Sequence, residues 1–342
     1  MQRRKPKQAD KLGENVELDQ AVVDRLPQHS KVLSVTASGT SLWVGTVKIV
    51  VELEDGNTVE FFKKGSSGDV GADMMKGSYE AELALHTFVP ELVPKPIAWG
   101  TYASDPDTHF YLCEFVEMYD DLPDPSDWAA AVSTLHLKTM GHSPTGQFGF
   151  HVPTHLANVP VDNTWNSSWA AFWAQQMKSL FDREEMVRGP HEELNSLKAA
   201  YLEKTIPRYL APLEAEGRSI QPCLIHSDLW PGNIKPKTES EELCMFDSCA
   251  YWGHNEADLG ICRNPRYKLG RPCIVEYNKR VDMSEPIADF DGRNAVYAMK
   301  YHALLSVMYS SQDSFRQVLI DELKSLLGRI ENEADPCIAS HL

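Results

Sequence analysis

The sequence has little of several features that would mark particular classes of protein. No apolar run among its 342 residues approaches the roughly 18 that a membrane-spanning helix needs, so no span is expected. Lys and Arg number only 33 against 49 Asp and Glu, a net charge of −16. A field of that sign repels phosphate backbones and anionic lipid. We therefore expect binding neither to nucleic acid nor to membranes.

The spacing of the cysteines gives no sign of a metal site. The seven cysteines include no C-x-x-C pair and no Cys/His ligand pattern, so structural zinc is not expected. Cys113 and Cys244 lie in apolar runs, where a thiol packs as a small hydrophobic group. The N-terminal stretch is basic and polar and does not read as a secretory signal. We expect a reducing, cytoplasmic location.

One stretch, LIHSDLWPGN at 224–233, carries most of the chemistry. It contains His226, Asp228 and Asn233 in the spacing H-x-D-x-x-x-x-N. In phosphotransferases this spacing places the aspartate beside the acceptor hydroxyl, and the asparagine ligates the metal on the nucleotide. Asp247 ends the next apolar run, as expected for a second metal-binding carboxylate. A structural Pro-Gly turn explains the loop alone but not that later acid, so the pattern predicts an ATP- and Mg²⁺-dependent kinase.

The N-terminal part reads as strands, at 31–38, 44–55 and 57–64. Gly39 lies on the tip of the first hairpin, where backbone N–H groups are expected over phosphates, although an ordinary hairpin fits this stretch equally well. Lys63 or Lys64 is expected to hold the α- and β-phosphates. Strand alternation puts these two side chains on opposite faces and does not choose between them.

A loop is expected at 65–71, followed by a helix at 73–89 that Pro90 stops. The acid partner of the lysine is expected on this helix, with Glu80 and Glu82 as candidates. The apolar strand that follows ends in a hinge, where backbone groups of Glu114 and Val116 are expected to pair with adenine.

A polar connector begins at Tyr119, and we place a lobe boundary there. Residues 1–30 form a tail and short helix, 31–118 a nucleotide-binding N-lobe, and 119–342 a C-lobe with the catalytic loop and sugar site. The expected fold class is α+β and bilobal. The N-lobe is a small antiparallel sheet with one main helix, and the larger C-lobe is mostly helical.

Two further residues are candidates on the substrate side. Trp165 begins an aromatic cluster with Trp169, Phe172 and Trp173, which mostly reads as core, but its irregular start suits a pocket wall for a sugar-like ligand. Asp258 begins an apolar turn, where an acid can accept hydrogen bonds from the catalytic-loop backbone. A helix N-cap explains the spacing of Asp258 equally well.

HSDLWPGN followed by FDSCAYWGHNEADLG resembles the fructosamine kinase family, whose signature is H-G-D-L-W-x-G-N and then D-P-x-x-x-x-G-H-x-E-x-D. FFKK, VPKPIAWG, HFYLCEF, FGF, DNTW and DGRNAVYAMKY extend the resemblance over nearly 30–330, with a balance of features similar to fungal members. The resemblance implies a protein-kinase-like fold. It also implies ATP-dependent phosphorylation of the 3-hydroxyl of ketosamines, the ribulosamine or fructosamine adducts on lysine amines, which leads to protein deglycation.

By motif, the resemblance implies that Asp228 is the base and that Asn233 and Asp247 bind magnesium. His226 would orient the loop. Trp230 would form a wall of the sugar site, and we group Trp165 and Asp258 with it as substrate residues.

The chain departs from the family pattern at three places. Ser227 stands where the family usually has glycine, and Ser248 where it usually has proline. Spacing back from V-P-K-P puts the helix acid at Glu80, or even at Ser78, which is no acid. For the lysine, Lys64 fits the F-x-K alignment.

The expected partner is a glycated protein or a small ketosamine, and the expected state is a monomer. Two alternatives remain at this point. One is a related small-molecule kinase, of aminoglycoside or choline type, with another hydroxyl acceptor. The other is a nucleotide-binding pseudokinase, suggested by the ambiguous helix acid.

Overall fold

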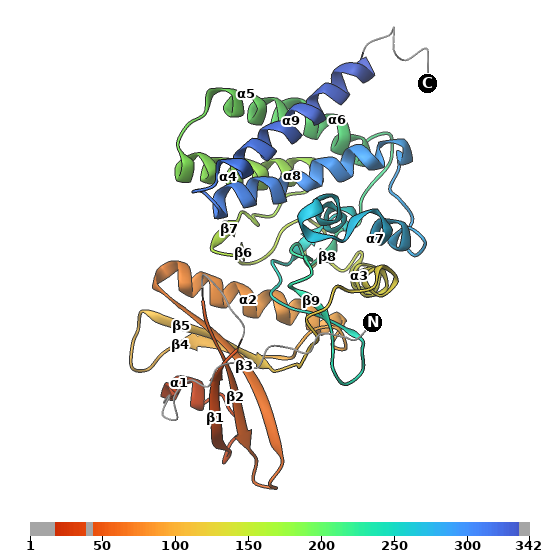
Figure 1. The fold of residues 1–342 in the computed structure, drawn as a ribbon. Helices are drawn as coiled ribbons and strands as arrows, with labels where there is room; N and C mark the ends of the chain where they lie inside the picture. Colours follow the sequence, from red (N-terminus) through yellow and green to blue (C-terminus); the bar gives the residue numbers. More distant parts are fainter. Residues whose placement is uncertain (1–17, 39–43, 335–342) are drawn as a thin grey trace. The chain divides into compact units, whose positions relative to one another are not determined.

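The structure is a computed structural model that describes residues 18–38 and 44–334 (Figure 1). These residues form two compact units. The first unit runs to Asp127 and also contains 152–160 and 231–250; the second contains 128–151, 161–230 and the chain from Tyr251 onward. This division differs from the expected single boundary at 118/119, because two later segments pack with the first unit.

A five-stranded antiparallel sheet forms the first unit, in the order β1-β2-β3-β5-β4. Alternating apolar residues such as Ile49, Val51 and Leu112 build a core on one of its faces. The bounds of its strands and of the short helix before them are α1 (Gln20–Val23), β1 (Lys31–Ala37), β2 (Gly45–Glu52), β3 (Thr58–Ser67), β4 (Pro96–Thr101) and β5 (Thr108–Glu114).

The main helix of the first unit, α2 (Gly68–Phe88), packs against β3, β4 and β5 (Figure 1). The prediction of a loop at 65–71 is wrong. Strand β3 continues to Ser67, which pairs with Thr108 of β5, and the ladder hydrogen bonds satisfy this backbone. Gly68, at φ +78°, then makes the sharp change from strand to helix that favours glycine.

The later segments of the first unit are two small hairpins, β6 (Thr154–Leu156) with β7 (Val159–Val161), and β9 (Ile234–Pro236) with β10 (Leu243–Met245). The second hairpin is tied to the sheet side of the unit, because Tyr119 N donates to Pro236 O at 2.9 Å and Met245 N donates to Leu92 O at 2.7 Å. The first lies against Gly77 of α2, where a Cβ would approach Pro153 O to 2.5 Å.

The second unit is mostly helical. Helix α8 packs against α4 and α9 (Figure 1) and is buried along nearly its whole length. The expected core residues Trp169, Phe172 and Trp173 are all buried. The expected α+β composition is confirmed. The helices and strands of this unit are α3 (Pro125–Thr139), α4 (Trp169–Arg188), α5 (Glu192–Ala200), η1 (Tyr201–Thr205), α6 (Ile206–Leu210), η2 (Ala211–Glu214), β8 (Cys223–Ile225), β11 (Tyr251–Gly253), η3 (Asn255–Arg263), η4 (Pro265–Tyr267), α7 (Gly270–Tyr277), η5 (Ile287–Asp289), α8 (Phe290–Met308) and α9 (Asp313–Ala334).

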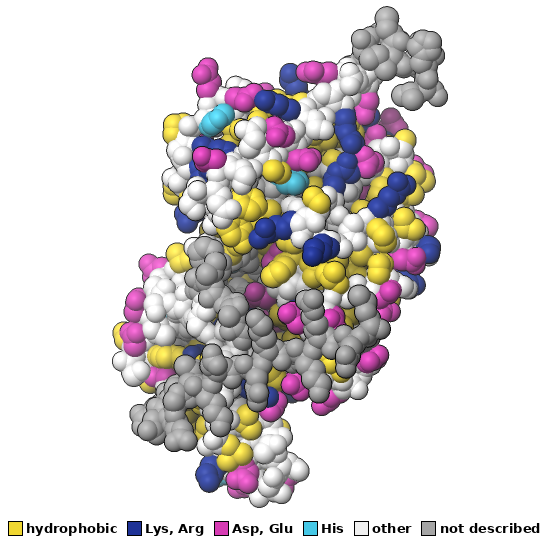
Figure 2. All heavy atoms as spheres, in the orientation of Figure 1, with side chains coloured by type: hydrophobic (Ala, Val, Ile, Leu, Met, Phe, Trp, Pro, Cys, Tyr) yellow, Lys and Arg dark blue, Asp and Glu magenta, His cyan; other side chains and the backbone are white. Residues whose placement is uncertain are grey.

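On the face drawn in Figure 2, basic and acidic side chains are interspersed over the helical unit. Such mixed charge is typical of solvated outer faces of helices. Among residues 18–38 and 44–334, no helix has both the length and the apolar character needed to cross a bilayer.

Candidate active site

Strand β3 carries two adjacent lysines, Lys63 and Lys64, that have different hydrogen-bond partners. Lys64 Nζ donates to Asp247 Oδ1 at 2.5 Å, whereas Lys63 Nζ donates to the hydroxyl of Tyr102. Lys64 is only 7% exposed. Burial alone would lower the pKa of Lys64, but the charge and hydrogen bond of Asp247 outweigh it and hold the pKa above its usual value. The opposite faces expected for the two lysines are therefore observed, and Lys64 is the one beside Asp247.

Glu82 is the acid of α2 that shares this environment. It is 3% exposed, its Oε1 accepts a hydrogen bond from Ser248 N at 2.9 Å, and its charge acts on Lys64. Its Oε2 has no hydrogen-bond partner among the described residues. Burial raises the pKa of Glu82 to about 7. We therefore replace the predicted Glu80, which is only partly buried, by Glu82.

Hairpin register brings Asn233 and Asp247 together. Ile234 pairs with Met245, and Phe246 N donates to Asn233 O at 3.0 Å, so the residues that flank the two strands are neighbours. The Asn233 side-chain amide donates to Asp247 O at 3.4 Å. The Asp247 side chain is 59% exposed and its backbone has φ +56°, a left-handed value that is uncommon outside glycine and clusters at functional sites.

The other residues predicted to contact the nucleotide are Glu114, Val116 and Gly39. Glu114 ends β5, and its backbone N–H is used internally, donating to Lys95 O at 2.9 Å. Phe115 N likewise donates to Glu60 O at 3.0 Å. Val116 makes no hydrogen bond to another described residue, so it is the better of the two predicted hinge residues for an incoming ligand. Gly39 lies outside the described residues.

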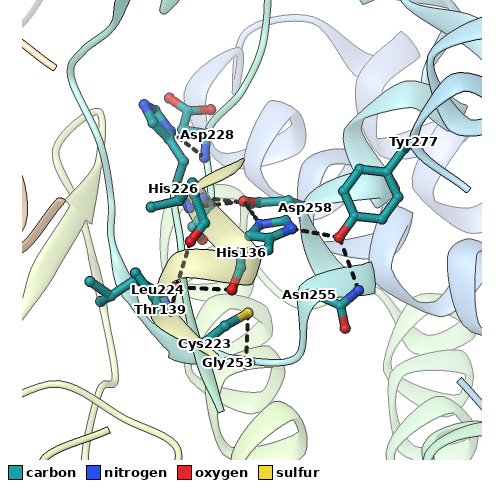
Figure 3. A network of polar contacts seen from close by, with 12 residues as sticks. His136, Thr139, Cys223, Leu224, His226, Asp228, Gly253, Asn255, Asp258 and Tyr277 are labelled. Atoms are coloured by element: carbon teal, nitrogen blue, oxygen red, sulfur yellow. Dashed lines mark hydrogen bonds and ion pairs between the residues drawn. The ribbon is translucent and has the colours of Figure 1, made fainter. Parts of the chain in front are cut away.

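The second unit holds the catalytic loop by its backbone. His226 N donates to Asp258 Oδ2 at 2.9 Å and Ser227 N donates to Asp258 Oδ1 at 2.7 Å (Figure 3). Asp258 is fully buried. Burial alone would raise the pKa of Asp258, but the hydrogen bond and charge of His136 and the His226 backbone keep it below its usual value.

A buried polar chain continues behind Asp258. His136 Nε2 lies 3.1 Å from Asp258 Oδ2, and His136 Nδ1 lies 2.7 Å from the Tyr277 hydroxyl, which also accepts from Asn255 Nδ2 at 3.0 Å (Figure 3). Sequence reasoning missed His136 and Tyr277. His136 lies on the buried face of α3, and in the sequence a single histidine among apolar residues reads as core.

Asp228 follows directly on this anchored backbone and is partly exposed. Its N–H donates to His226 Nδ1 at 3.3 Å, so the His226 ring contacts the backbone of Asp228. Trp230 is 42% exposed, and its ring centroid lies 6.3 Å from that of Tyr267. An exposed aromatic face thus lies two residues beyond Asp228 in the chain.

The two other predicted substrate residues have different surroundings. Trp165 is partly buried and packs on Gly149, where a Cβ would come within 2.9 Å of the indole. Asp258 has no exposed surface, and both its oxygens accept backbone hydrogen bonds. Grouping Asp258 with residues that touch a substrate is therefore wrong, because its carboxylate faces the protein interior.

Comparison with known proteins identifies the family of this chain. The fructosamine kinase family model matches residues 19–325. The chain belongs to the fructosamine kinase family. Protein-ribulosamine 3-kinase of rice (Oryza sativa subsp. indica) is 27% identical over 201 residues, which are 59% of this chain and 55% of that protein. The chain thus spans about half the length of the curated relatives that it matches.

Solved structures show the fold that this chain shares with other proteins. A protein assigned as a fructosamine-3-kinase from Haemophilus somnus 129PT superposes with a TM-score of 0.66 at 15% identity, covering 90% of this chain and 96% of that one. The aminoglycoside phosphotransferase APH(4)-Ia, in a ternary complex with AMP-PNP and hygromycin B, gives 0.59 at 12% identity, with 90% and 97% covered. At these identities the comparison concerns fold alone, and the expected protein-kinase-like fold is confirmed.

Proposed function

We propose that this chain is an ATP-dependent kinase that phosphorylates the 3-hydroxyl of ketosamines, the ribulosamine or fructosamine adducts of lysine amines. One observation carries the proposal beyond family membership. Asp228 extends from a backbone that Asp258 anchors, and five residues later Asn233 adjoins Asp247, which pairs with Lys64. This is the set of side chains that phosphoryl transfer requires.

On the nucleotide side, Lys64 holds the α- and β-phosphates, and Glu82 takes the role of its helix acid. The residues present fit a magnesium ion, because Asn233 supplies an amide oxygen next to the exposed carboxylate of Asp247. Magnesium is usually bound by one or two protein groups together with waters and phosphate oxygens, which agrees with a site made of these two side chains. When bound, magnesium supplies charge neutralisation on the phosphates.

On the acceptor side, Asp228 accepts the proton of the sugar 3-hydroxyl. The hydroxyl oxygen forms a bond to the γ-phosphorus, the bond from that phosphorus to the bridging oxygen breaks, and ADP leaves. His226 and Asp258 keep Asp228 in place, so the loop does not reorganise during the reaction. The family resemblance implies that the phosphorylated adduct then eliminates and frees the amine.

Trp230 offers an exposed indole face for the sugar, and Trp165 is a second wall. The substrate is a glycated protein or a small ketosamine, and the chain acts as a monomer. A cytoplasmic location is part of the proposal. It is supported by six buried free cysteines among the described residues, typical of a reducing compartment.

The two alternatives have less support. The pseudokinase reading depended on an ambiguous helix acid, and the buried Glu82 beside Lys64 removes that ground. No feature of the described residues favours another hydroxyl acceptor.

The test is ATP consumption with magnesium, comparing ribulosamine-lysine with fructosamine-lysine and with choline and an aminoglycoside as control acceptors. We expect turnover of a ketosamine alone, and the ratio of the two rates assigns the preferred sugar. Turnover only of a control acceptor would replace the proposed substrate. ATP binding without any turnover would revive the pseudokinase.

A further inference from the structure

The peptide bond between Ser227 and Asp228 is held at both ends. Its carbonyl oxygen accepts hydrogen bonds from Lys300 Nζ at 2.8 Å and from the Tyr301 hydroxyl at 3.3 Å. Its N–H donates to His226 Nδ1 at 3.3 Å. These bonds restrain ψ of Ser227 and φ of Asp228, the two angles that set the direction in which the Asp228 side chain leaves the backbone.

Ser227 has an unusual backbone for its residue type. Its φ is +70°, in the left-handed region where a Cβ is unfavourable, and the family signature has glycine at this position. The serine hydroxyl adds a contact that glycine lacks, because it accepts a hydrogen bond from Lys300 Nζ at 2.5 Å. One ammonium group thus binds both the carbonyl and the side chain of the strained residue.

Lys300 is 4% exposed and lies on the buried helix α8. Burial of an ammonium is unfavourable unless acceptors and π faces replace its water. Its Nζ lies 5.0 Å from the ring centroid of Tyr301 and 5.8 Å from that of Tyr251. An uncharged side chain of similar length would fill this space without desolvation, so the lysine contributes through its hydrogen bonds to Ser227.

We propose that Lys300 is a positioning residue for the catalytic base, and that it forms with Ser227 a coupled pair that replaces a glycine in the catalytic loop. The lysine holds Ser227 in the left-handed conformation and thereby aims Asp228. The proposal rests on the proposed role of Asp228 as base and goes beyond it, because it assigns a function to a residue outside the family signature.

The first test is Lys300→Met in the full chain, assayed with ATP and the preferred ketosamine. We expect kcat to fall at least 30-fold while KM for ATP stays within threefold, because Lys64 and Asp247 are untouched. Lys198→Met is the matched control. Lys198 is an equally buried lysine of the same unit, paired with Glu184 at 2.7 Å, and its loss should lower Tm but leave kcat of the folded enzyme within twofold.

The second test is rescue. Glycine adopts a φ of +70° without strain, so a loop with glycine depends less on the lysine, although the lysine's bond to the Ser227 carbonyl is still lost. We expect the double variant Ser227→Gly/Lys300→Met to have a kcat at least fivefold higher than that of Lys300→Met alone. Absence of any recovery overturns the coupling, and a Lys300→Met enzyme with kcat within twofold of the parent overturns the positioning role. If Lys300→Met fails to fold, Lys300→Leu, which also lacks a donor, is tested in its place against the same limits.

The third test does not depend on activity. Hydrogen exchange of the peptide covering 224–233 should be at least tenfold faster in Lys300→Met and unchanged in Lys198→Met. Equal exchange in both variants overturns the proposal. A parent enzyme that turns over no ketosamine rejects the proposed function instead, and the exchange measurement still decides whether Lys300 holds the loop.

Discussion

Two buried acids, one in each unit, have opposite surroundings. Asp258 of the second unit accepts hydrogen bonds at both oxygens, from two backbone N–H groups and from His136, and its pKa is lowered. Glu82 of the first unit has one oxygen bonded to Ser248 N and the other without a partner, and burial raises its pKa to about 7. Burial is nearly complete for both, so the hydrogen bonds decide which form each acid prefers.

The two acids differ in how completely their carboxylate oxygens are hydrogen-bonded. The loop that carries Asp228 is held by satisfied buried bonds and needs no rearrangement. On the nucleotide side, Lys64 bonds Asp247, a carboxylate that the proposed metal would share, and Glu82 Oε2 remains able to accept. Satisfied buried hydrogen bonds therefore preorganise the loop of the second unit, whereas the carboxylate of Glu82 is only partly satisfied.

The largest expected effect comes from removing the base while leaving its support intact. Asp228→Asn should lower kcat by about 10²–10⁴-fold, because general-base catalysis contributes on this scale. Nucleotide affinity should change little, since Lys64 and Asp247 lie in the other unit. Steady-state kinetics and a nucleotide-binding titration measure the two effects. A normal kcat would remove Asp228 from the mechanism.

Removing the hydrogen bonds that Asp258 accepts should mainly lower the free energy of unfolding. Asp258→Ala leaves two buried N–H groups and His136 without their acceptor, and we expect a loss of about 3–5 kcal/mol in the free energy of unfolding. Glu82→Gln should cost no stability at neutral pH, because Gln keeps the acceptor for Ser248 N and removes a charge that burial disfavours. Urea unfolding compares the two variants. Equal losses in the free energy of unfolding would contradict the different hydrogen bonding of the two acids.

A smaller effect distinguishes the neighbouring lysines. Lys64→Met should raise KM for ATP by roughly 10- to 100-fold, the scale of a lost charged hydrogen bond. Lys63→Met removes a bond to Tyr102 only and should change KM less than about threefold. Kinetics at saturating ketosamine make the comparison. A larger effect at Lys63 would reverse the assignment.

The smallest effect is a pH dependence of stability. The pKa of Glu82 is about 7 when folded, above its ordinary value of 4.5, so the unfolded chain ionises first as pH rises. This group therefore makes stability fall between about pH 4.5 and 7, by at most roughly 3–4 kcal/mol. Glu82→Gln should raise Tm relative to the parent at pH 7.5 and not at pH 4.5. The same Tm difference at both pH values would contradict the shift.

Local pattern was sufficient for much of the site. The spacing of Asp228, Asn233 and Asp247 predicted the loop and the hairpin acid, because short offsets fix which residues flank a turn. The prediction failed where partners are distant in sequence. Spacing favoured Glu80, yet Glu82 is the residue that α2 turns toward Lys64, since a difference of two residues rotates a helical side chain by about 200°.

The sequence by itself determined the family, the α+β fold and the identity of the catalytic loop, because these depend on contiguous motifs and on hydrophobic periodicity. Only the tertiary structure decided what holds them. His136 and Lys300 lie far along the chain from the loop that they serve, and no local pattern distinguishes a buried polar side chain with partners from one without. Folding supplies those partners, and with them the direction of each pKa shift and the conformation of Ser227.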